Sequence, residues 1–166
     1  MSDHAMHEAD QDDYQFPATQ IVVQPSYVNR AAVKAGLWGY LVSSSGSCIE
    51  LHRRQREYII GRGDPKKTGL PNFIGIEDVR VSRMHCSITW NGQEDENGAL
   101  IRVTQLSRTN STWVNHHELK PLPAENTVYE IKHGQRISFA GDEGADCVAY
   151  EFSFVAAGMD YTMTAL

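Results

Sequence analysis

Short runs of β-branched and aromatic residues alternate with clusters of glycine, asparagine, aspartate and proline from about residue 35 to residue 155. Such runs are typical of β-strands that are separated by turns. We predict strands at residues 37–42, 47–51, 57–61, 72–74, 86–90, 100–105, 112–114, 128–131, 135–140 and 149–155. No apolar pattern with a period of about 3.6 residues reaches helical length, so the sequence predicts an all-β sandwich.

The same pattern divides the chain into one folded domain and two ends. Residues 1–34 carry an acidic run and the prolines Pro17 and Pro25 with little periodicity, which is typical of a disordered acidic and polar tail. We predict the domain at residues 35–156 and a C-terminal extension or linker at residues 157–166. Inside the domain, Asn91-Gly92 and residues 94–98 predict turns, and residues 132–135 predict a tight hairpin between two alternating strands.

Composition and charge exclude several classes of partner. Of the 166 residues, 41% are hydrophobic, which is enough for a packed core, and the formal net charge is -6. The chain therefore lacks the broad positive field with which proteins attract nucleic-acid phosphates. No run approaches the roughly 20 apolar residues of a membrane span, and the first residues lack the apolar run of a secretion signal. We expect an intracellular protein that binds neither nucleic acid nor membranes.

The cysteine and histidine positions argue against a disulfide framework or a metal site. Cys48, Cys86 and Cys147 are an odd number, lie far apart and form no Cys-x-x-Cys pair. The adjacent residues His116 and His117 match no compact zinc spacing, and neighbours on a strand point to opposite faces. We expect no metal and no cofactor.

Three polar clusters lie beside predicted strands. Gly61 and Arg62 follow a strand, residues 82–85 (Ser-Arg-Met-His) precede one, and residues 109–112 (Thr-Asn-Ser-Thr) precede another. Each cluster alone is ordinary loop chemistry. Their order and spacing are the distinguishing feature.

This arrangement resembles the forkhead-associated (FHA) family, whose pattern is Gly-Arg, then Ser-x-x-His, then Asn-Gly-Thr-x-x-Asn. Here the corresponding residues are Gly61-Arg62, Ser82-x-x-His85 and residues 110–115 (Asn-Ser-Thr-Trp-Val-Asn). The resemblance covers roughly residues 37–155, and residues 37–39 (Leu-Trp-Gly) are similar to the first strand of FHA domains in checkpoint serine/threonine kinases. It implies a sandwich of about eleven strands that binds phosphothreonine peptides with loops at one end.

The resemblance also implies a role for each matching residue. Arg62 would pair with the phosphate, Ser82 and Thr109 would donate hydrogen bonds to it, and Arg83 would add charge at its edge. These groups suit a phosphothreonine, which carries about -1.5 to -2 charge at pH 7 and three acceptor oxygens. Asn110 would bind the main chain of the peptide, because its amide offers both donors and an acceptor.

A further role follows from the resemblance. Arg80 stands where some family members select an acidic residue three places after the phosphothreonine, which implies a preference for pThr-x-x-Asp. The alternative is a solvated arginine paired with Asp78 or Glu77, and the sequence leaves both interpretations open.

Other residues are implied to support the site, namely Gly61, His85 and Asn115. Ser111 and His116 replace glycines of the family pattern, so a backbone with positive φ at either position would be strained by about 1 kcal/mol or more. We expect these two departures to alter the shape of the loop rather than to abolish binding.

Alternative functions are a hydrolase with Ser82 as nucleophile and His85 as base, or an interaction domain that ignores phosphate. Against the hydrolase, no third orienting acid stands out. Residues 61–67 lack the Gly-Lys-Ser/Thr ending of a nucleotide-binding loop, and we expect no helix after them. The chain lacks the motifs of a protein kinase, so we expect a binding module and no enzyme.

The cellular context is implied by the resemblance alone. It places the chain at the N-terminus of a checkpoint kinase whose catalytic domain lies beyond residue 166, acting in the DNA-damage or replication checkpoint in the nucleus. Thr19-Gln20 is a dipeptide of the kind that DNA-damage kinases phosphorylate. Thr19 is therefore a candidate phosphosite for self-association between two copies, although Val22 three places later conflicts with an acidic preference.

Overall fold

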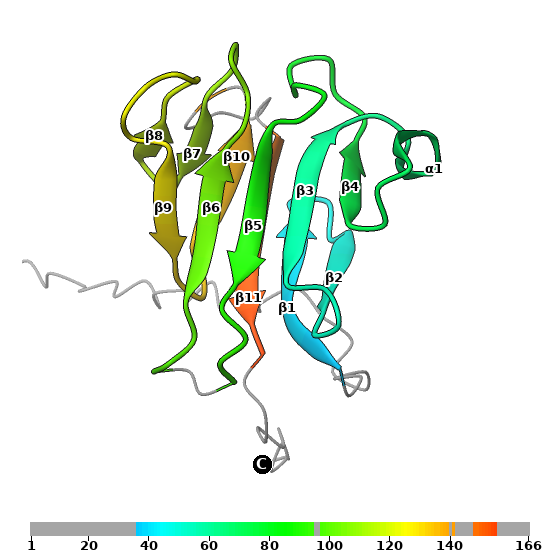
Figure 1. Ribbon diagram of the computed structural model, residues 1–166, viewed down its shortest axis with the longest axis vertical. Helices are drawn as coiled ribbons and strands as arrows, with labels where there is room; N and C mark the ends of the chain where they lie inside the picture. Colours follow the sequence, from blue (N-terminus) through cyan, green and yellow to red (C-terminus); the bar gives the residue numbers. More distant parts are fainter. Residues whose placement is uncertain (1–35, 95–96, 140, 142–147, 156–166) are drawn as a thin grey trace, which may run out of the picture.

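The computed structural model describes residues 36–94, 97–139, 141 and 148–155 (Figure 1). This part of the chain contains eleven strands and one helix of four residues. The predicted tail and the predicted C-terminal extension lie outside the described residues, and so does Thr19. The helix in the described part of the chain is too short and too polar to cross a membrane.

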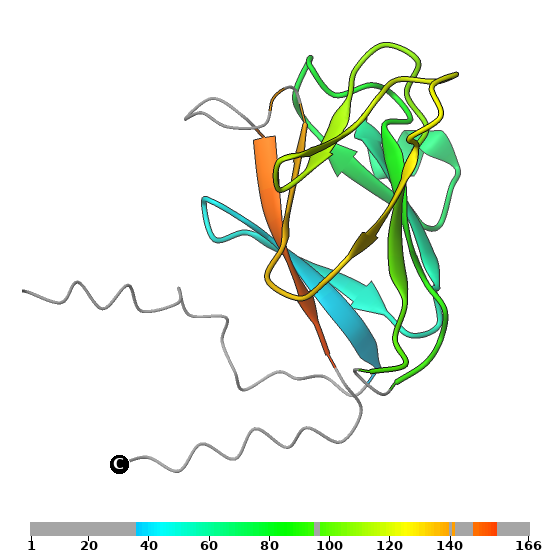
Figure 2. The same cartoon turned by 90° about the vertical axis from the view of Figure 1, so that its left-hand side faces the viewer.

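The strands form two sheets that face each other (Figure 2). The first sheet has the order β2 (Cys48–His52), β1 (Leu37–Ser43), β11 (Val148–Phe154), β10 (Arg136–Phe139), β7 (Thr112–Val114) and β8 (His117–Leu119). The second sheet has the order β4 (Phe73–Ile76), β3 (Glu57–Arg62), β5 (Cys86–Trp90), β6 (Ile101–Gln105) and β9 (Val128–Ile131). The predicted all-β sandwich is confirmed.

Aromatic side chains from both sheets form the centre of the core. Trp38 of β1 is fully buried and stacks on Trp90 of β5 with ring centroids 5.7 Å apart. Tyr58 of β3 and Phe152 of β11 pack against the same indole at 6.3 Å and 6.2 Å. Because large aromatic side chains bury the most apolar area, this cluster ties one sheet to the other.

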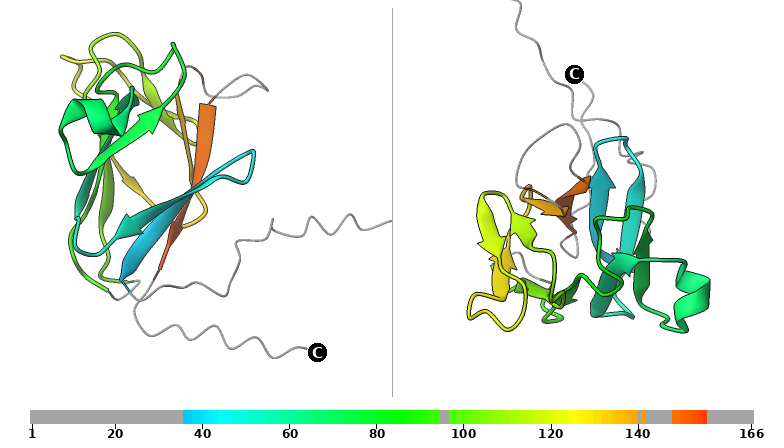
Figure 3. Two further views of the ribbon diagram at one scale, coloured as in Figure 1. Left: turned by 90° about the vertical axis from the view of Figure 1, so that its right-hand side faces the viewer. Right: turned by 90° about the horizontal axis from the view of Figure 1, so that it is seen from above.

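The loops that carry the predicted site residues lie at one end of the sandwich (Figures 1 and 3). β3, β4 and β6 end there, and β5 and β7 begin there. The loops at residues 77–85 and 106–111 therefore meet at this end. β1 begins and β11 ends at the opposite end, where the Val155 amide donates to the Trp38 carbonyl at 3.0 Å.

The structure corrects three details of the prediction. β8 was not predicted, because its three residues are too short and too polar to show a strand pattern. The helix α1 (Pro65–Thr68) follows the Gly61-Arg62 loop, where no helix was expected. The Asp64 carboxylate caps it by accepting from the Lys66 amide, and Pro65 suits the first helical turn.

The third correction concerns residues 132–135. They form a tight turn in which the Gln135 amide donates to the Lys132 carbonyl at 3.1 Å, with Gly134 at φ 80. However, β9 pairs with β6, whereas β10 pairs with β7 and β11. The turn therefore carries the chain from one sheet to the other, and the predicted hairpin is wrong.

Candidate functional site

Strand β3 ends where the loop of residues 82–85 rests directly on it. The Arg62 amide donates to the Ser82 carbonyl at 2.9 Å. A Cβ atom at Gly61 would stand 2.0 Å from the Arg83 carbonyl oxygen, far inside van der Waals contact. Gly61 is therefore required for the loop to approach the strand this closely, and this approach places Arg62 beside Ser82.

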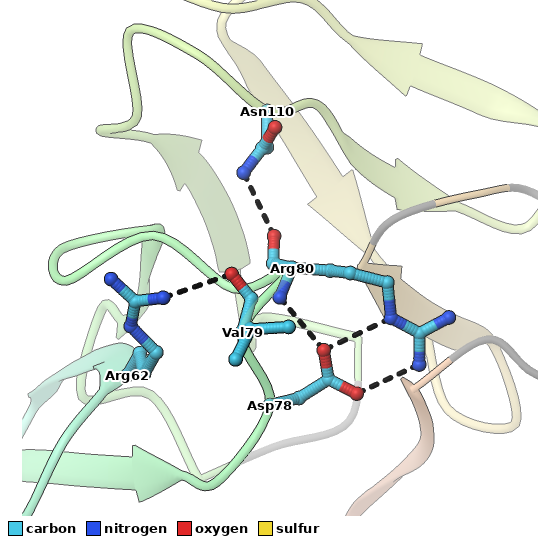
Figure 4. Close-up of polar contacts among 5 residues, drawn as sticks. All are labelled: Arg62, Asp78, Val79, Arg80 and Asn110. Atoms are coloured by element: carbon cyan, nitrogen blue, oxygen red, sulfur yellow. Dashed lines mark hydrogen bonds and ion pairs between the residues drawn. The ribbon is translucent and has the colours of Figure 1, made fainter.

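The Arg62 side chain is exposed at this strand end. Its Nη1 donates to the Val79 carbonyl at 3.0 Å, which links β3 to the loop after β4 (Figure 4). No carboxylate among the described residues forms an ion pair with it. The guanidinium is thus held in place by a neutral carbonyl and retains its positive charge for an anion.

Hydroxyl groups from two loops meet next to Arg62. Ser82 Oγ lies 2.7 Å from Ser107 Oγ and 3.2 Å from Thr109 Oγ1. Ser107 is nearly fully buried, and its Oγ accepts hydrogen bonds from the Thr109 amide at 3.1 Å and the Asn110 amide at 3.0 Å. This shapes the loop so that the exposed Thr109 hydroxyl lies beside Ser82.

His85 is fully buried beneath these loops and joins them. The Ser82 amide donates to its Nδ1 at 3.0 Å, so Nδ1 carries no hydrogen and Nε2 must carry it. Nε2 then donates to the Ser111 carbonyl at 3.0 Å, and the ring packs edge-on against Phe139 with centroids 4.9 Å apart. Both ring nitrogens are occupied by backbone groups in the neutral form of the imidazole.

Asn110 connects the loop of residues 106–111 to the loop of residues 77–85. Its Nδ2 donates to the Arg80 carbonyl at 2.8 Å and lies 3.4 Å from Ser82 Oγ (Figure 4). The Asn110 amide group therefore lies against the loop of residues 77–85, on the same side as Ser82 and Thr109. The structure brings Arg62, Ser82, Thr109 and Asn110 together at one end of the sandwich.

The family model of the FHA domain matches residues 58–140, half of the chain, and this segment includes every residue of the cluster just described. The chain belongs to the FHA family. FHA domains are phosphopeptide-binding modules and have no catalytic activity. A search of curated proteins found no match to this chain.

Two solved structures of FHA domains share this fold. The MEK1 FHA domain in complex with a HOP1 phosphothreonine peptide is 18% identical, with a TM-score of 0.51, over 71% of this chain and 97% of that one. The N-terminal FHA domain of Rad53p from S. cerevisiae, in complex with a phosphothreonine peptide, is 17% identical, with a TM-score of 0.50, over 71% and 94%. Mycobacterium tuberculosis EmbR, in complex with a low-affinity phosphopeptide, is 20% identical, with a TM-score of 0.48, over 72% of this chain and a quarter (25%) of EmbR.

Gln105 and Ser107 shape the loop that carries Thr109 and Asn110, although the sequence analysis did not single them out. The Gln105 side chain is buried; its Nε2 donates to the Asn110 carbonyl at 2.6 Å and the Ser107 carbonyl at 3.2 Å. Its Oε1 accepts from the Thr112 amide at 3.1 Å and the Thr112 hydroxyl at 2.6 Å. One amide thus closes the loop of residues 106–111 from inside.

The structure accommodates Ser111 and His116, the two residues that replace glycines of the family pattern, without positive φ. Within the described part of the chain, Asn115 is the only residue other than glycine with positive φ, at 51°. Neither Ser111 nor His116 is strained, and asparagine is well suited to the conformation of Asn115. Ser111 Oγ donates to Glu118 Oε1 at 2.6 Å, which ties the loop to β8.

Asn115 links the turn between β7 and β8 to β10. Its amide donates to the Arg136 carbonyl at 2.8 Å, and its Oδ1 accepts from the Arg136 amide at 2.9 Å. This reciprocal pair fixes the β7–β8 turn to the neighbouring strand. The supporting position predicted for Asn115 therefore has a defined geometry.

The remaining predicted residues take different positions. Arg83 is exposed, and its carbonyl packs on Gly61. The Arg80 guanidinium pairs with Asp78, with Nη2 at 2.7 Å from Oδ2 and Nε at 3.0 Å from Oδ1.

Ser82 Oγ makes no hydrogen bond with the His85 ring, whose two nitrogens are hydrogen-bonded to backbone groups, so the geometry does not support the hydrolase alternative. In the described residues, no group of three metal-ligating side chains comes together.

Lowering the pH below 6.5 is expected to destabilise this FHA domain through His85. Burial lowers the pKa of His85 from its ordinary value of 6.5, whereas its hydrogen bond to Ser111 acts in the opposite direction. The unfolded chain binds the proton first, so stability is full above pH 6.5 and falls as the pH drops towards the folded-state pKa, by at most about 1.4 kcal/mol per pH unit. Protonation of Nδ1 would also remove the acceptor of the Ser82 amide.

Denaturant unfolding at several pH values between 7.5 and 5 checks this expectation. In the variant His85→Gln the contribution of this group to the pH dependence disappears, so the curve of stability against pH becomes flatter than in the unmodified protein. His116→Gln, which changes an exposed histidine, serves as the control. Equal slopes in the unmodified protein and in His85→Gln would contradict the role assigned to His85.

Proposed function

We propose that this FHA domain binds phosphothreonine peptides with Arg62, Ser82 and Thr109 on the phosphate and Asn110 on the peptide main chain. The observation that carries the proposal is the meeting of a charged guanidinium, two adjacent hydroxyl groups and an amide at one end of the sandwich. Gly61, His85 and Asn115 hold the loops that present these groups. Arg83, exposed on the same loop, adds positive charge at the edge.

The chemistry of this cluster matches a phosphate. Arginine presents a planar set of donors that pairs with phosphate oxygens, and hydrogen bonds to an ionised acceptor are about twice as strong as neutral ones. Ser82 and Thr109 lie 3.2 Å apart at their hydroxyls, so both can donate to oxygens of one phosphate after rotation of their hydrogens. The MEK1 and Rad53p domains, each solved with a phosphothreonine peptide, support the same ligand class for this chain.

Asn110 and Arg80 are proposed to read the peptide around the phosphothreonine. The Asn110 amide offers donors and an acceptor to the peptide backbone. Arg80 carries the proposed preference for an acidic residue three places after the phosphothreonine, pThr-x-x-Asp. The Arg80 carbonyl accepts a hydrogen bond from Asn110 Nδ2, which fixes the Arg80 backbone at the border of the cluster.

The substitution Arg62→Ala is expected to weaken binding of a pThr-x-x-Asp peptide by about 10- to 100-fold, the loss expected for removing charge-assisted hydrogen bonds. Titration calorimetry with this peptide, its phosphoserine twin and its unphosphorylated twin measures the effect. Arg54→Ala, which removes an exposed arginine from the turn after β2, is expected to bind as the unmodified protein does. Equal binding of the phosphorylated and unphosphorylated peptides would favour an interaction domain that ignores phosphate.

The cellular role is proposed from the resemblance of residues 37–39 to checkpoint-kinase FHA domains. In that role the chain is the N-terminal part of a nuclear serine/threonine kinase in the DNA-damage or replication checkpoint. Phosphorylated Thr19 of one copy is proposed as a ligand for the site of another. Sedimentation of the chain with and without phosphate on Thr19 tests this self-association. A dimer is expected only with the phosphate, and Arg62→Ala is expected to abolish it.

A further inference from the structure

The backbone of residues 79 and 80 is anchored from both sides of the site. Arg62 Nη1 donates to the Val79 carbonyl at 3.0 Å, and Asn110 Nδ2 donates to the next carbonyl, that of Arg80, at 2.8 Å (Figure 4). The two side chains assigned to the phosphate and to the peptide main chain thus hold one short backbone segment between them. The backbone at residues 79 and 80 is therefore held in place relative to Arg62 and Asn110.

The charged end of Arg80 is already occupied by a carboxylate. Asp78 Oδ2 lies 2.7 Å from Arg80 Nη2, and Oδ1 accepts from Arg80 Nε at 3.0 Å and from the Arg80 amide at 2.8 Å. The side chain of Arg80 is 42% exposed and that of Asp78 is 19% exposed. Both oxygens of Asp78 thus face the guanidinium in a forked pair at the surface (Figure 4).

We propose that Asp78 is a specificity-determining residue of this site: it occupies the Arg80 guanidinium, so that an acidic side chain of the peptide binds Arg80 only by displacing Asp78. The proposal rests on the proposed function, phosphothreonine-peptide binding. In this proposal, Asp78 determines how strongly the site prefers an acidic residue in the peptide. Arg80 determines the peptide position at which that acidic residue binds.

Physical arguments support competition between Asp78 and a carboxylate of the peptide for the Arg80 guanidinium. Exposed ion pairs contribute little to stability, because water screens them and two side chains must be held in one geometry. Asp78 lies only two residues from Arg80, so it competes at a high effective concentration. Its pKa is lowered to about 2 by the side-chain and backbone hydrogen bonds from Arg80, so the competitor is ionised throughout the physiological range.

The substitution Asp78→Asn isolates the charge of this competitor. Asparagine keeps an Oδ1 that accepts from the Arg80 amide, so the local turn is preserved. Glu77→Gln is the matched control, since it removes one negative charge from the neighbouring exposed residue without touching the forked pair. Arg80→Ala, alone and combined with Asp78→Asn, completes a double-mutant cycle.

The experiment measures Kd for a set of phosphothreonine peptides in which one aspartate is moved through the positions from three before to four after the phosphothreonine, with alanine elsewhere. We expect the gain in affinity from aspartate at one position to rise about two- to fivefold in Asp78→Asn, the range for relief of an exposed ion pair. Arg80→Ala is expected to remove the gain at that position, whether residue 78 is changed or not.

The outcomes are distinguishable. A uniform change at all positions in Asp78→Asn, equal to that in Glu77→Gln, would show general electrostatics and overturn the proposal while leaving phosphopeptide binding intact. An unchanged profile in Asp78→Asn would overturn it equally. If no peptide in the set binds better than its unphosphorylated twin, the proposed function fails and the role of Asp78 fails with it.

Discussion

Replacing Gly61 with alanine is expected to remove phosphopeptide binding and to lower the free energy of unfolding by about 1–3 kcal/mol, the range for overpacking a closely packed position. The new methyl group would stand 2.0 Å from the Arg83 carbonyl oxygen and 2.7 Å from the Arg83 carbonyl carbon. These are backbone atoms, so no side-chain rotation relieves the collision. The loop must move away from β3, which separates Ser82 from Arg62.

Denaturant unfolding and calorimetry with a phosphothreonine peptide measure the two effects of Gly61→Ala. Gly46→Ala is the control, because Gly46 has positive φ in the turn between β1 and β2 but open space where a Cβ would be. It is expected to lower stability by about 1 kcal/mol through backbone strain and to leave binding unchanged. Binding in Gly61→Ala at the strength of the unmodified protein would show that the loop does not need its contact with β3.

The substitution Gln105→Leu is expected to lower the free energy of unfolding by about 3 kcal/mol or more, since each buried polar group left without a partner costs about 1–3 kcal/mol. The groups concerned are the amide and hydroxyl of Thr112 and the carbonyl of Asn110, whereas the Ser107 carbonyl keeps its hydrogen bond from the Leu122 amide. Because this amide closes the loop of residues 106–111, phosphopeptide affinity should fall together with stability.

Thermal or denaturant unfolding checks the effect of Gln105→Leu. Gln93→Leu makes the same chemical change at an exposed position and is expected to alter stability by no more than about 0.5 kcal/mol. A loss in Gln105→Leu as small as in Gln93→Leu would contradict the role of the buried amide. Retained peptide affinity in a destabilised Gln105→Leu variant would show that the loop keeps its shape without it.

The sequence predicted the strands and singled out the residues that the structure brings together at one end of the sandwich, because their signals are local. Alternating apolar residues mark strands such as β5 and β6, and the spacing of Gly61-Arg62 and Ser82-x-x-His85 is visible in the chain itself. The three residues of β8 give no such pattern, so that strand was missed. Whether a tight turn joins partners or changes sheets, as at residues 132–135, depends on strand pairing that no local signal encodes.

The supporting side chains were missed for a similar reason. Gln105 lies in an ordinary alternating strand, and its function arises only because residues 107 to 112 fold back over its end. Ser107 precedes Thr109 and Asn110 by two and three residues, a spacing typical of a serine that caps a turn, so it could have been found by asking what shapes that loop. For Arg80, the sequence left ligand selection and pairing with Asp78 as alternatives, and the structure shows the second in the free protein.

The first and last strands of the domain, β1 and β11, are neighbours in one sheet, and the folded chain enters and leaves at the end remote from the binding loops. A domain with adjacent ends can be placed between other segments of a longer protein without spreading them apart. Chain segments that precede β1 or follow β11 therefore attach at the end remote from the loops of residues 77–85 and 106–111. A partner held by those loops would approach the domain at the end opposite to both attachment points.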